Sequence, residues 1–474
     1  MLKPAVSKEA GVRELPEVQL GGRLAGLTLM QQVVVLAMWP LLEQVLAFFV
    51  GLTDLLISGR MAIGAERVAI LDAMGLGGYV GWFFNILQGA VATGVMALVS
   101  RATGARDHPL ANRGLGQGVW LGIIAGLISL VLLYAGIPLL VEAIGLTPEA
   151  GVQATKFLKV LAFAGPFSGA MFAVNAALRG AGDTRTPFLS MVVVNVVNMG
   201  MSSLLVFGPA PFGGHGIAGI ATGTVIGWIA GCLTAVLMLG HGRSEGLRWS
   251  RISLAPSWRT MQRILRVGAP QSFEILVMWL VHAFGIHVIA NLNHEGSLGA
   301  HMLAIRVESM SFLPGFAVAT AAAALVGQYL GAGSKEMAVK AARMCWKMGV
   351  GLMTSIGILF VLFRYSLIEL MAPGSTLHAQ LSAPLLIVSA FTQPFFATCI
   401  ILKTSMRGAG ATTVVMRWSF GSMFFYRVGV LWWLFHHGGI SLTQVWIVLG
   451  CDLFTQSIAF SWLHFRGRWL EAKV

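Results

Sequence analysis

The sequence predicts an all-α integral membrane protein of about twelve transmembrane helices, arranged as two pseudo-symmetric lobes of six helices each. Only 11% of the 474 residues are charged and 56% are hydrophobic, whereas about 25% of the residues of a soluble globular chain are charged. Long apolar runs follow one another along the whole chain, and each can span a bilayer as a helix. The second half of the chain also repeats motifs of the first half.

The apolar runs are separated by Gly, Pro or charged residues, and none shows the alternating pattern of a membrane β-barrel strand. Several are long enough to cross the bilayer at a tilt. The predicted spans are residues 33–58, 68–99, 115–141, 155–178, 187–207, 216–240, 264–291, 298–328, 344–363, 382–406, 412–435 and 441–464.

Lys and Arg are concentrated in alternate connections between these runs, which is typical of cytoplasmic loops. The net charge of +13 therefore indicates membrane topology and not a nucleic-acid partner. Both termini are expected in the cytoplasm. The predicted division is a cytoplasmic N-terminal tail (1–26), an N-lobe (27–241), a basic cytoplasmic linker (242–262), a C-lobe (263–466) and a cytoplasmic C-terminal tail (467–474).

The internal repeat preserves both order and spacing. Motifs within residues 91–105 recur within residues 318–332 at an offset of 227, and the RGAG of residues 179–182 recurs at residues 407–410. Each repeat holds six predicted spans, an even number, so both halves enter the membrane in the same direction. Such halves are related by an axis along the membrane normal, and transporters built this way bind substrate between or within the halves.

The first span carries two acidic residues, Glu43 and Asp54, and a proline, Pro40. The two acids are about three helical turns apart and point from one side of the helix. A charge at membrane depth is costly and usually faces a cavity or a partner. Because Pro40 removes a backbone hydrogen bond and kinks the helix, we expect bending of this helix to accompany a change in the charge of the acids.

Specific motifs then indicate a family. They are GLTDLLISGRMA (51–62), ALVSRATGARD (97–107), LRGAGDTRTP (178–187), NVVN (195–198), GIAGIATGTVIG (216–227), RVESMSFLPGFAVATAAAALVGQYLGAG (306–333) and MRGAG (406–410). With these motifs the chain resembles the MATE family of multidrug and toxic-compound extrusion antiporters over nearly its whole length. The resemblance implies two six-helix lobes that open alternately to the two sides of the membrane. It also implies export of amphipathic, often cationic compounds in exchange for H⁺ or Na⁺.

The resemblance carries over only part of the family's set of functional residues. Asp54 matches the first-span aspartate and Asn198 the fifth-span asparagine, while Ser202 stands where an aspartate usually follows. Met278 and Phe396 stand where some members have the acids of a C-lobe cation site. Coupling is therefore expected in the N-lobe, with H⁺ or Na⁺ left open. The predicted ion-coupling residues are Asp54, Glu43, Asn198, Asn195 and Ser202.

Two further groups are candidates. A possible polar site in the C-lobe consists of Glu274, His282, Glu308 and Arg306, and its alternative is a structural network that holds helices together. Met and aromatic side chains near the acids suit flat cationic compounds, although such residues also pack in cores or face lipid. The substrate-cavity candidates are Met38, Trp39, Met278, Trp279 and Phe395.

The predicted function is secondary active multidrug efflux in the bacterial inner membrane, by antiport with H⁺ or Na⁺ and without covalent chemistry. The alternative is a flippase for a lipid-linked or polysaccharide precursor, for which a cavity lined by many basic residues is expected. Only Arg306 and Arg427 lie mid-span, which disfavours it. A membrane-embedded enzyme is also disfavoured, because it would need clustered His and acidic residues at catalytic spacing, and no P-loop or HExxH motif occurs. We expect a monomer that needs no metal or organic cofactor, and whose partners are small amphipathic molecules and the lipid bilayer.

Overall fold

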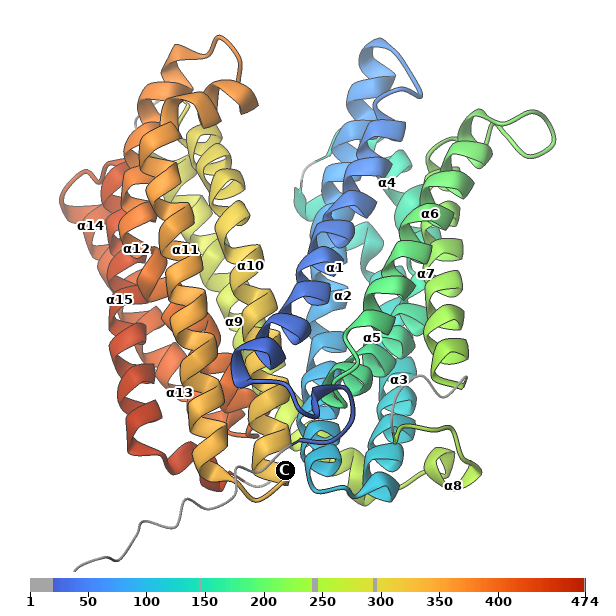
Figure 1. Cartoon of the computed structure of the whole chain (residues 1–474). Helices are drawn as coiled ribbons and strands as arrows, with labels where there is room; N and C mark the ends of the chain where they lie inside the picture. The colour runs from blue at the N-terminus through green and yellow to red at the C-terminus, as the bar shows by residue number, and fades with distance from the viewer. Residues whose placement is uncertain (1–19, 145, 241–245, 293–295, 473) are drawn as a thin grey trace, which may run out of the picture.

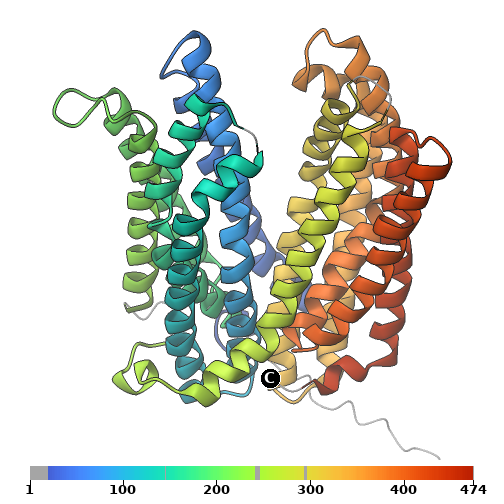
Figure 2. The same cartoon turned by 180° about the vertical axis from the view of Figure 1, so that it is seen from behind.

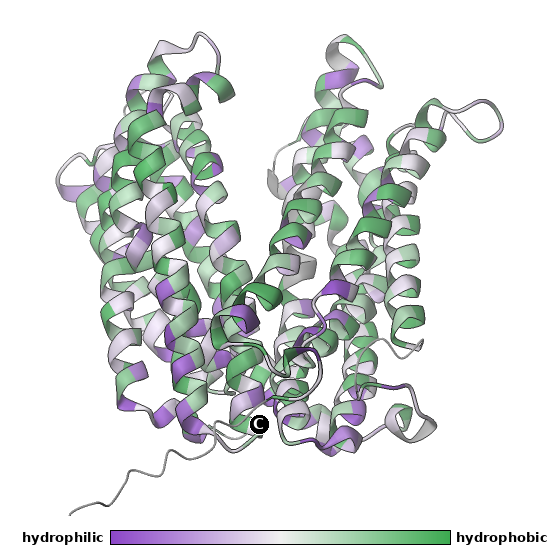
Figure 3. Ribbon diagram, in the orientation of Figure 1, coloured by the Kyte–Doolittle hydropathy of each residue, from purple (hydrophilic) through white to green (hydrophobic). Residues whose placement is uncertain are grey.

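A computed structural model describes residues 20–144, 146–240, 246–292, 296–472 and 474. These residues form helices and connecting turns without any β-strand, which confirms the predicted fold class. The hydropathy of the helices explains this architecture, because hydrophobic residues predominate along most of their length (Figure 3). A backbone surrounded by lipid must satisfy its hydrogen bonds within its own segment, and helices do so.

The helices fall into two groups that correspond to the two predicted lobes. The N-lobe contains α1 (Leu29–Ser58), α2 (Gly64–Gly104), α3 (His108–Ile144), α4 (Pro148–Leu161), α5 (Ala164–Gly180), α6 (Arg185–Phe207) and α7 (Gly216–Gly240). The short helix α8 (Arg251–Leu254) lies in the linker. The C-lobe contains α9 (Trp258–Ala290), α10 (Ser297–Gly331), α11 (Lys335–Met371), α12 (Thr376–Gly408), α13 (Thr412–Met423), α14 (Leu431–His437) and α15 (Leu442–Arg466).

Ten helices of the described residues are long and apolar enough to cross a membrane, or eleven if the bent pair α4 and α5 forms one span. That pair meets at an angle of 49°. The predicted span 412–435 corresponds to α13, a π-helical segment η2 (Phe424–Val430) and α14, which follow one another directly. Insertion of π-helical turns divides this span into three pieces, a feature that hydropathy alone does not reveal.

The two lobes meet at one end of the molecule. Their ribbons lie apart at the upper end of Figure 1 and converge at the lower end, and the reverse view agrees (Figure 2). Contacts between the lobes join α2 to α9 and α10, and α1 to α10. The C-terminus lies at the converging end, where the Arg263 guanidinium donates to a terminal oxygen of Val474 at 2.7 Å.

Glycines allow the close approach of α2 and α10 at this end. A Cβ atom on Gly104 would lie 1.9 Å from the carbonyl oxygen of Gln328, and one on Gly331 would lie 2.0 Å from that of Arg101. Gly104 and Gly331, like Arg101 and Gln328, are separated by the offset of the internal repeat. The two contacts are therefore symmetry mates, and the pseudo-twofold axis passes between α2 and α10.

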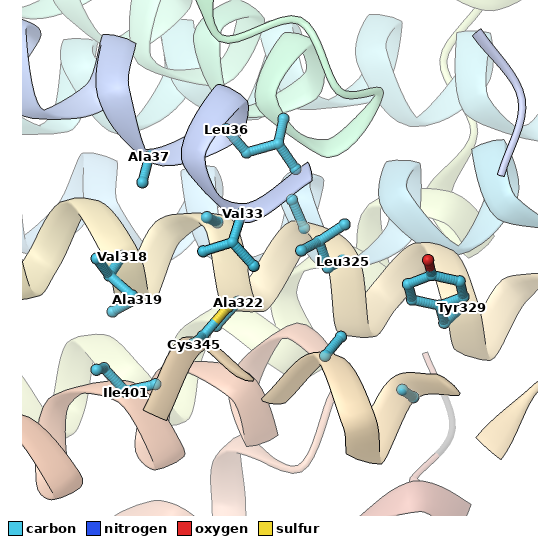
Figure 4. Close-up of a cluster of buried hydrophobic side chains, with 14 of the residues drawn as sticks. Val33, Leu36, Ala37, Val318, Ala319, Ala322, Leu325, Tyr329, Cys345 and Ile401 are labelled. Atoms are coloured by element: carbon cyan, nitrogen blue, oxygen red, sulfur yellow. The ribbon is translucent and has the colours of Figure 1, made fainter. Parts of the chain in front are cut away.

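A buried apolar cluster completes this junction (Figure 4). Val33, Leu36 and Ala37 of α1 pack with Val318 and Leu325 of α10, and Cys345 of α11 belongs to the same cluster. The Tyr329 hydroxyl donates to Gln32 Oε1 at 2.8 Å, so the buried phenol is satisfied across the lobes.

The described parts of both predicted tails and of the linker are folded against the lobes or form helix. Residues 1–19 of the predicted N-terminal tail lie outside the described residues, but Leu20 and Leu24 are buried in the cluster above and Arg23 forms an ion pair with Asp183 at 2.8 Å. Helix α9 begins at Trp258, inside the predicted linker, because Pro256 and Ser257 interrupt the preceding backbone and start a new helix. Trp469, in the predicted C-terminal tail, is buried.

Candidate coupling site and N-lobe cavity

Asp54 lies near the end of α1 that is remote from the lobe junction, and its side chain is buried (5% exposed). Its carboxylate accepts two hydrogen bonds from neutral donors. Asn198 Nδ2 of α6 lies 3.1 Å from Oδ1, and Thr224 Oγ1 of α7 lies 3.0 Å from Oδ2. No ion pair of the described residues involves Asp54, so only neutral groups hold this acid.

Glycines of the GIAGIATGTVIG segment bring α7 against α6. A Cβ atom on Gly223 would lie 2.2 Å from Ser202 Oγ, and one on Gly227 would lie 3.1 Å from Asn198 Cβ. Larger residues at these positions would push α7 away and separate Thr224 from Asn198, which now lie 2.9 Å apart, Oγ1 to Nδ2. Small residues at helix contacts in membranes have this effect generally.

Ser202 is the third member of the cluster around Asn198. Its hydroxyl lies 3.5 Å from Asn198 Nδ2 and donates to the Ile220 carbonyl oxygen at 3.2 Å. Asn195 is not part of this cluster, because its amide donates to the Met191 carbonyl within the same helix at 2.9 Å. The structure thus gathers Asp54, Asn198 and Ser202 from the predicted ion-coupling set, and leaves Asn195 outside.

Glu43, the fifth predicted coupling residue, forms an ion pair with Arg179 at the end of α5. Arg179 follows directly after the predicted span 155–178, and hydropathy does not identify it as the partner of Glu43. The repeat of RGAG at Arg407 is the signal that could have identified it. Arg407 pairs in the same way with Glu274, the acid that follows the proline of α9.

Thr224 is the member of the Asp54 cluster that the sequence motifs did not indicate. Its hydroxyl is buried and contacts both Asp54 and Asn198. The available signal was a pair of threonines in an apolar, glycine-rich span, but Thr222 and Thr224 can be distinguished only with the helix orientation. Thr222 instead donates to the Ala218 carbonyl of its own helix at 2.8 Å.

A cavity of about 800 Å³ lies beside this cluster and includes both Asp54 and Glu43 in its wall. Ligand sites in proteins commonly have volumes of about 300–1,000 Å³. Helices of the N-lobe provide most of the wall, and Arg306 and Thr320 of α10 complete it from the C-lobe. The methionine and aromatic residues of the wall are Met74, Phe157, Met171, Phe172, Met191 and Trp228.

The five predicted substrate-cavity residues are not in this wall. Trp39 packs on Phe188 with ring centroids 5.1 Å apart, and Phe395 packs edge-on against Phe454 at 4.9 Å. Met38 and Met278 are exposed and Trp279 is half-buried. Their role in substrate binding stays a prediction, while the described cavity has a different set of Met and aromatic residues.

The four residues of the predicted C-lobe polar site lie in separate surroundings. Glu274 pairs with Arg407 at 2.9 Å and lies 3.7 Å from Lys403 Nζ. The centroid of the His282 ring lies 6.5 Å from that of His301. Glu308 accepts a hydrogen bond from Ser389 at 2.9 Å. Arg306 faces the N-lobe cavity. The structure therefore does not bring these four side chains together.

Arg427 and Asp452 form a buried structural pair between η2 and α15. Arg427 Nε lies 2.5 Å from Asp452 Oδ2, and Ser422 and Gln456 donate to the other carboxylate oxygen. Every oxygen of this carboxylate thus has a partner, as a buried charge requires.

Comparisons with known proteins agree with this architecture. The family model MatE matches residues 40–204 and 270–433. A probable multidrug resistance protein NorM of Thermotoga maritima is 28% identical over 94% of both chains. Among solved structures, an outward-facing multidrug resistance MATE family transporter has a TM-score of 0.85 at 20% identity, covering 94% of this chain and 97% of that one. A MOP superfamily transporter of Pyrococcus furiosus, described as having a binding pocket of reverse polarity, has a TM-score of 0.84 at 21% identity, with the same coverage.

Proposed function

The chain belongs to the MATE family, a family of transporters and not of enzymes, and on that premise we propose that it exports amphipathic organic compounds, cationic ones included, in exchange for H⁺. The curated relative from Thermotoga maritima is named a probable multidrug resistance protein, which supports this substrate range. The proposed location is the bacterial inner membrane, with both termini in the cytoplasm.

The observation that carries the proposal is the neutral surroundings of Asp54 at the edge of the cavity. A cationic partner stabilises the ionised form of a carboxylate and so disfavours proton binding. A carboxylate held by neutral hydroxyl and amide groups can be charged or neutral. Asp54 has only such neutral partners among the described residues. Glu43, paired with Arg179, is the less suitable proton carrier of the two cavity acids.

Thr224 lets the cluster satisfy both states of Asp54. Its single hydroxyl proton can be donated either to Asp54 Oδ2 or to the Ile220 carbonyl oxygen, which lies 3.0 Å away. When Asp54 is ionised, Thr224 donates to it. When Asp54 carries a proton, the carboxyl group donates to Thr224 Oγ1 and the threonine proton turns to Ile220.

The junction of the lobes supports alternating access. If the basic linker lies in the cytoplasm, as the distribution of Lys and Arg indicates, the converging end is the cytoplasmic one and the cavity faces the opposite side. The α2–α10 contact depends on glycines, and no ion pair of the described residues joins these two helices, so it can separate without breaking one.

Na⁺ is the second candidate for the coupling ion, and one observation favours it. Asn198 Oδ1 is buried and has no hydrogen-bond partner among the described residues. This oxygen, the two carboxylate oxygens of Asp54 and Thr224 Oγ1 are hard ligands of the kind that Na⁺ binds.

A lipid-linked saccharide flippase fits this cavity less well. The basic residues in the described wall of the cavity are Arg179 and Arg306, and Glu43 neutralises Arg179. One free guanidinium is a weak site for a pyrophosphate group, which usually binds several positively charged donors.

Substitution of Asp54 by asparagine tests the proposal. Asp54→Asn should abolish ion-driven efflux and drug resistance in a drug-sensitive host, while the amount of protein in the membrane stays unchanged. The matched control is Asp72→Asn, because Asp72 is an exposed acid of α2 outside the cavity wall. Full resistance with Asp54→Asn would contradict the assignment.

A further inference from the structure

Of the described C-lobe residues in the wall of the N-lobe cavity, Arg306 is the one with a positive charge. It lies on α10 and is exposed. The other C-lobe residue in the wall, Thr320, lies 14 positions further along the helix. At about 1.5 Å per residue this places Arg306 roughly 21 Å from Thr320, toward the end of α10 that is remote from the lobe junction.

Arg306 and Asp54 stand at comparable distances from that junction. The buried cluster joins Val33 of α1 to Leu325 of α10. From there, Asp54 is about 32 Å along α1 and Arg306 about 28 Å along α10, at 1.5 Å per residue. The cavity thus has an acid on the N-lobe side and a guanidinium on the C-lobe side at a similar level.

In the wall, Glu43 and Arg179 neutralise each other, whereas neither Asp54 nor Arg306 has a partner of opposite charge among the described residues. Glu43 is paired with Arg179, and Asp54 accepts from Asn198 and Thr224. Among the described residues no carboxylate lies within 4.0 Å of the Arg306 guanidinium.

The neighbouring acid on the same helix does not compensate this charge. Glu308 lies two residues further on, about 200° around the helix. Its carboxylate accepts from Ser389 of α12 at 2.9 Å, inside the C-lobe.

We infer that Arg306 binds an acidic group of the transported compound, so that the cavity prefers amphipathic molecules that carry a carboxylate, as anions or zwitterions, over their uncharged esters. A guanidinium offers paired N–H donors in the geometry that a carboxylate accepts. The aromatic and methionine side chains of the wall then contact the apolar body of the compound. This inference shares one assumption with the proposed function, namely that the transported compound binds in this cavity.

Two dyes that differ only in whether the carboxyl group is free or esterified test the contribution of the acidic group to binding. Rhodamine 110 has a free carboxylic acid, and rhodamine 123 is its methyl ester with the same xanthene ring. Binding to the purified full-length protein in detergent is measured by fluorescence anisotropy for wild type, Arg306→Gln, Arg306→Lys and the control Arg60→Gln. Arg60 is an exposed arginine just beyond α1 that is not in the cavity wall.

The wild-type protein should bind the acid about tenfold more tightly than the ester, as one charge-assisted hydrogen-bonded contact predicts. Arg306→Gln should abolish this preference for the acid over the ester, and Arg306→Lys should retain part of it. Arg60→Gln should leave the preference unchanged. An unaltered ratio in Arg306→Gln, a wild-type ratio near one, or absence of binding of both dyes would each overturn the inference.

Efflux of the same dyes from vesicles is measured in parallel and separates the two proposals. If binding discriminates between the dyes as expected but neither is transported, the role of Arg306 stands and the proposed efflux function fails. If the ester is transported but binding does not depend on Arg306, efflux stands and this inference fails.

Discussion

The hydroxyl of Thr224 has two acceptors within reach, Asp54 Oδ2 at 3.0 Å and the Ile220 carbonyl oxygen at 3.0 Å. A single proton cannot serve both at once, so its position depends on the charge of Asp54. In the proposed proton mechanism Thr224 therefore positions the carboxyl group of Asp54 and does not itself carry the proton.

Thr224→Val should lower ion-driven efflux about tenfold, because loss of a hydrogen bond to a buried carboxylate costs about 1.5–3 kcal/mol. Valine keeps the shape of threonine and removes only the hydroxyl. Transport rates in everted vesicles, normalised to the amount of protein, provide the measurement.

The control for this variant is Thr222→Val, since among the described residues the Thr222 hydroxyl bonds only within its own helix. It should retain the wild-type rate. Equal effects of the two substitutions would show that the Thr224 hydroxyl has no special relation to Asp54.

Sequence patterns predicted part of this site and could not predict the rest. Asp54 and Asn198 were identified because the motifs around them are specific. Asn195 was grouped with them by proximity in sequence, but its side chain turns to the backbone of its own helix. Which of several polar residues on a helix faces a neighbour depends on how the helices pack, and hydropathy does not contain that information.

Arg306 illustrates the same limit. It was grouped with Glu308, two residues away, yet the two side chains leave α10 on nearly opposite sides. The sequence indicates this separation but not that one side faces the other lobe. Only the position of α10 against the N-lobe shows that Arg306 reaches the cavity.

At the scale of helices, each lobe contains an equivalent ion pair. Glu43 follows Pro40 in α1 and pairs with Arg179 of α5; Glu274 follows Pro270 in α9 and pairs with Arg407 of α12. In both lobes the pair joins a proline-containing helix to the helix that ends in RGAG. We interpret each ion pair as an anchor that fixes its proline-containing helix, α1 or α9, to the neighbouring helix. Bending of α1 or α9 is then limited to the part of the helix away from the ion pair.

Removal of one partner should destabilise the protein, because the remaining charge is left partly buried. Breaking a buried pair costs about 3–5 kcal/mol, and the side chains of Glu43 and Arg179 are only 14% and 17% exposed. Glu43→Gln should therefore lower the thermal unfolding midpoint in detergent. Glu274→Gln should lower it further, because it leaves both Arg407 and Lys403 without their acid.

The double variant Glu43→Gln with Arg179→Gln is the control, since it leaves no unpaired charge. Its unfolding midpoint should recover much of the loss. A midpoint as low as the sum of the two single effects would mean that the two side chains act independently and that the pair is not an anchor.

At the scale of the whole molecule, the internal repeat corresponds to the symmetry of the lobe junction. The repeat could be predicted from motifs and the positions of the spans from hydropathy, because motifs and hydropathy are local properties of the sequence. The interruption by η2 could not, because a π-helical turn depends on local backbone hydrogen bonding and not on composition. The burial of Leu20 and Leu24 could not be predicted either, since it depends on contacts with distant helices.

Gly104→Ala should shift the protein toward a conformation in which this junction is open, because the added Cβ would lie 1.9 Å from the Gln328 carbonyl oxygen. The distance between spin labels at Arg113→Cys and Glu336→Cys, both exposed near the junction end, should increase in a background without the four native cysteines.

Gly89→Ala on the same helix is the matched control, because a Cβ there meets nothing within 4 Å. It should leave the distance distribution unchanged. An unaltered distribution in Gly104→Ala would show that this contact does not control closure of the junction.

Proton flux during transport shows whether Asp54 couples proton movement to export. In everted vesicles that hold a pH gradient and no sodium gradient, addition of rhodamine 123 should dissipate the gradient with the wild-type protein and leave it intact with Asp54→Asn. Transport driven only by a sodium gradient, or substrate-dependent proton flux in Asp54→Asn, would contradict this coupling.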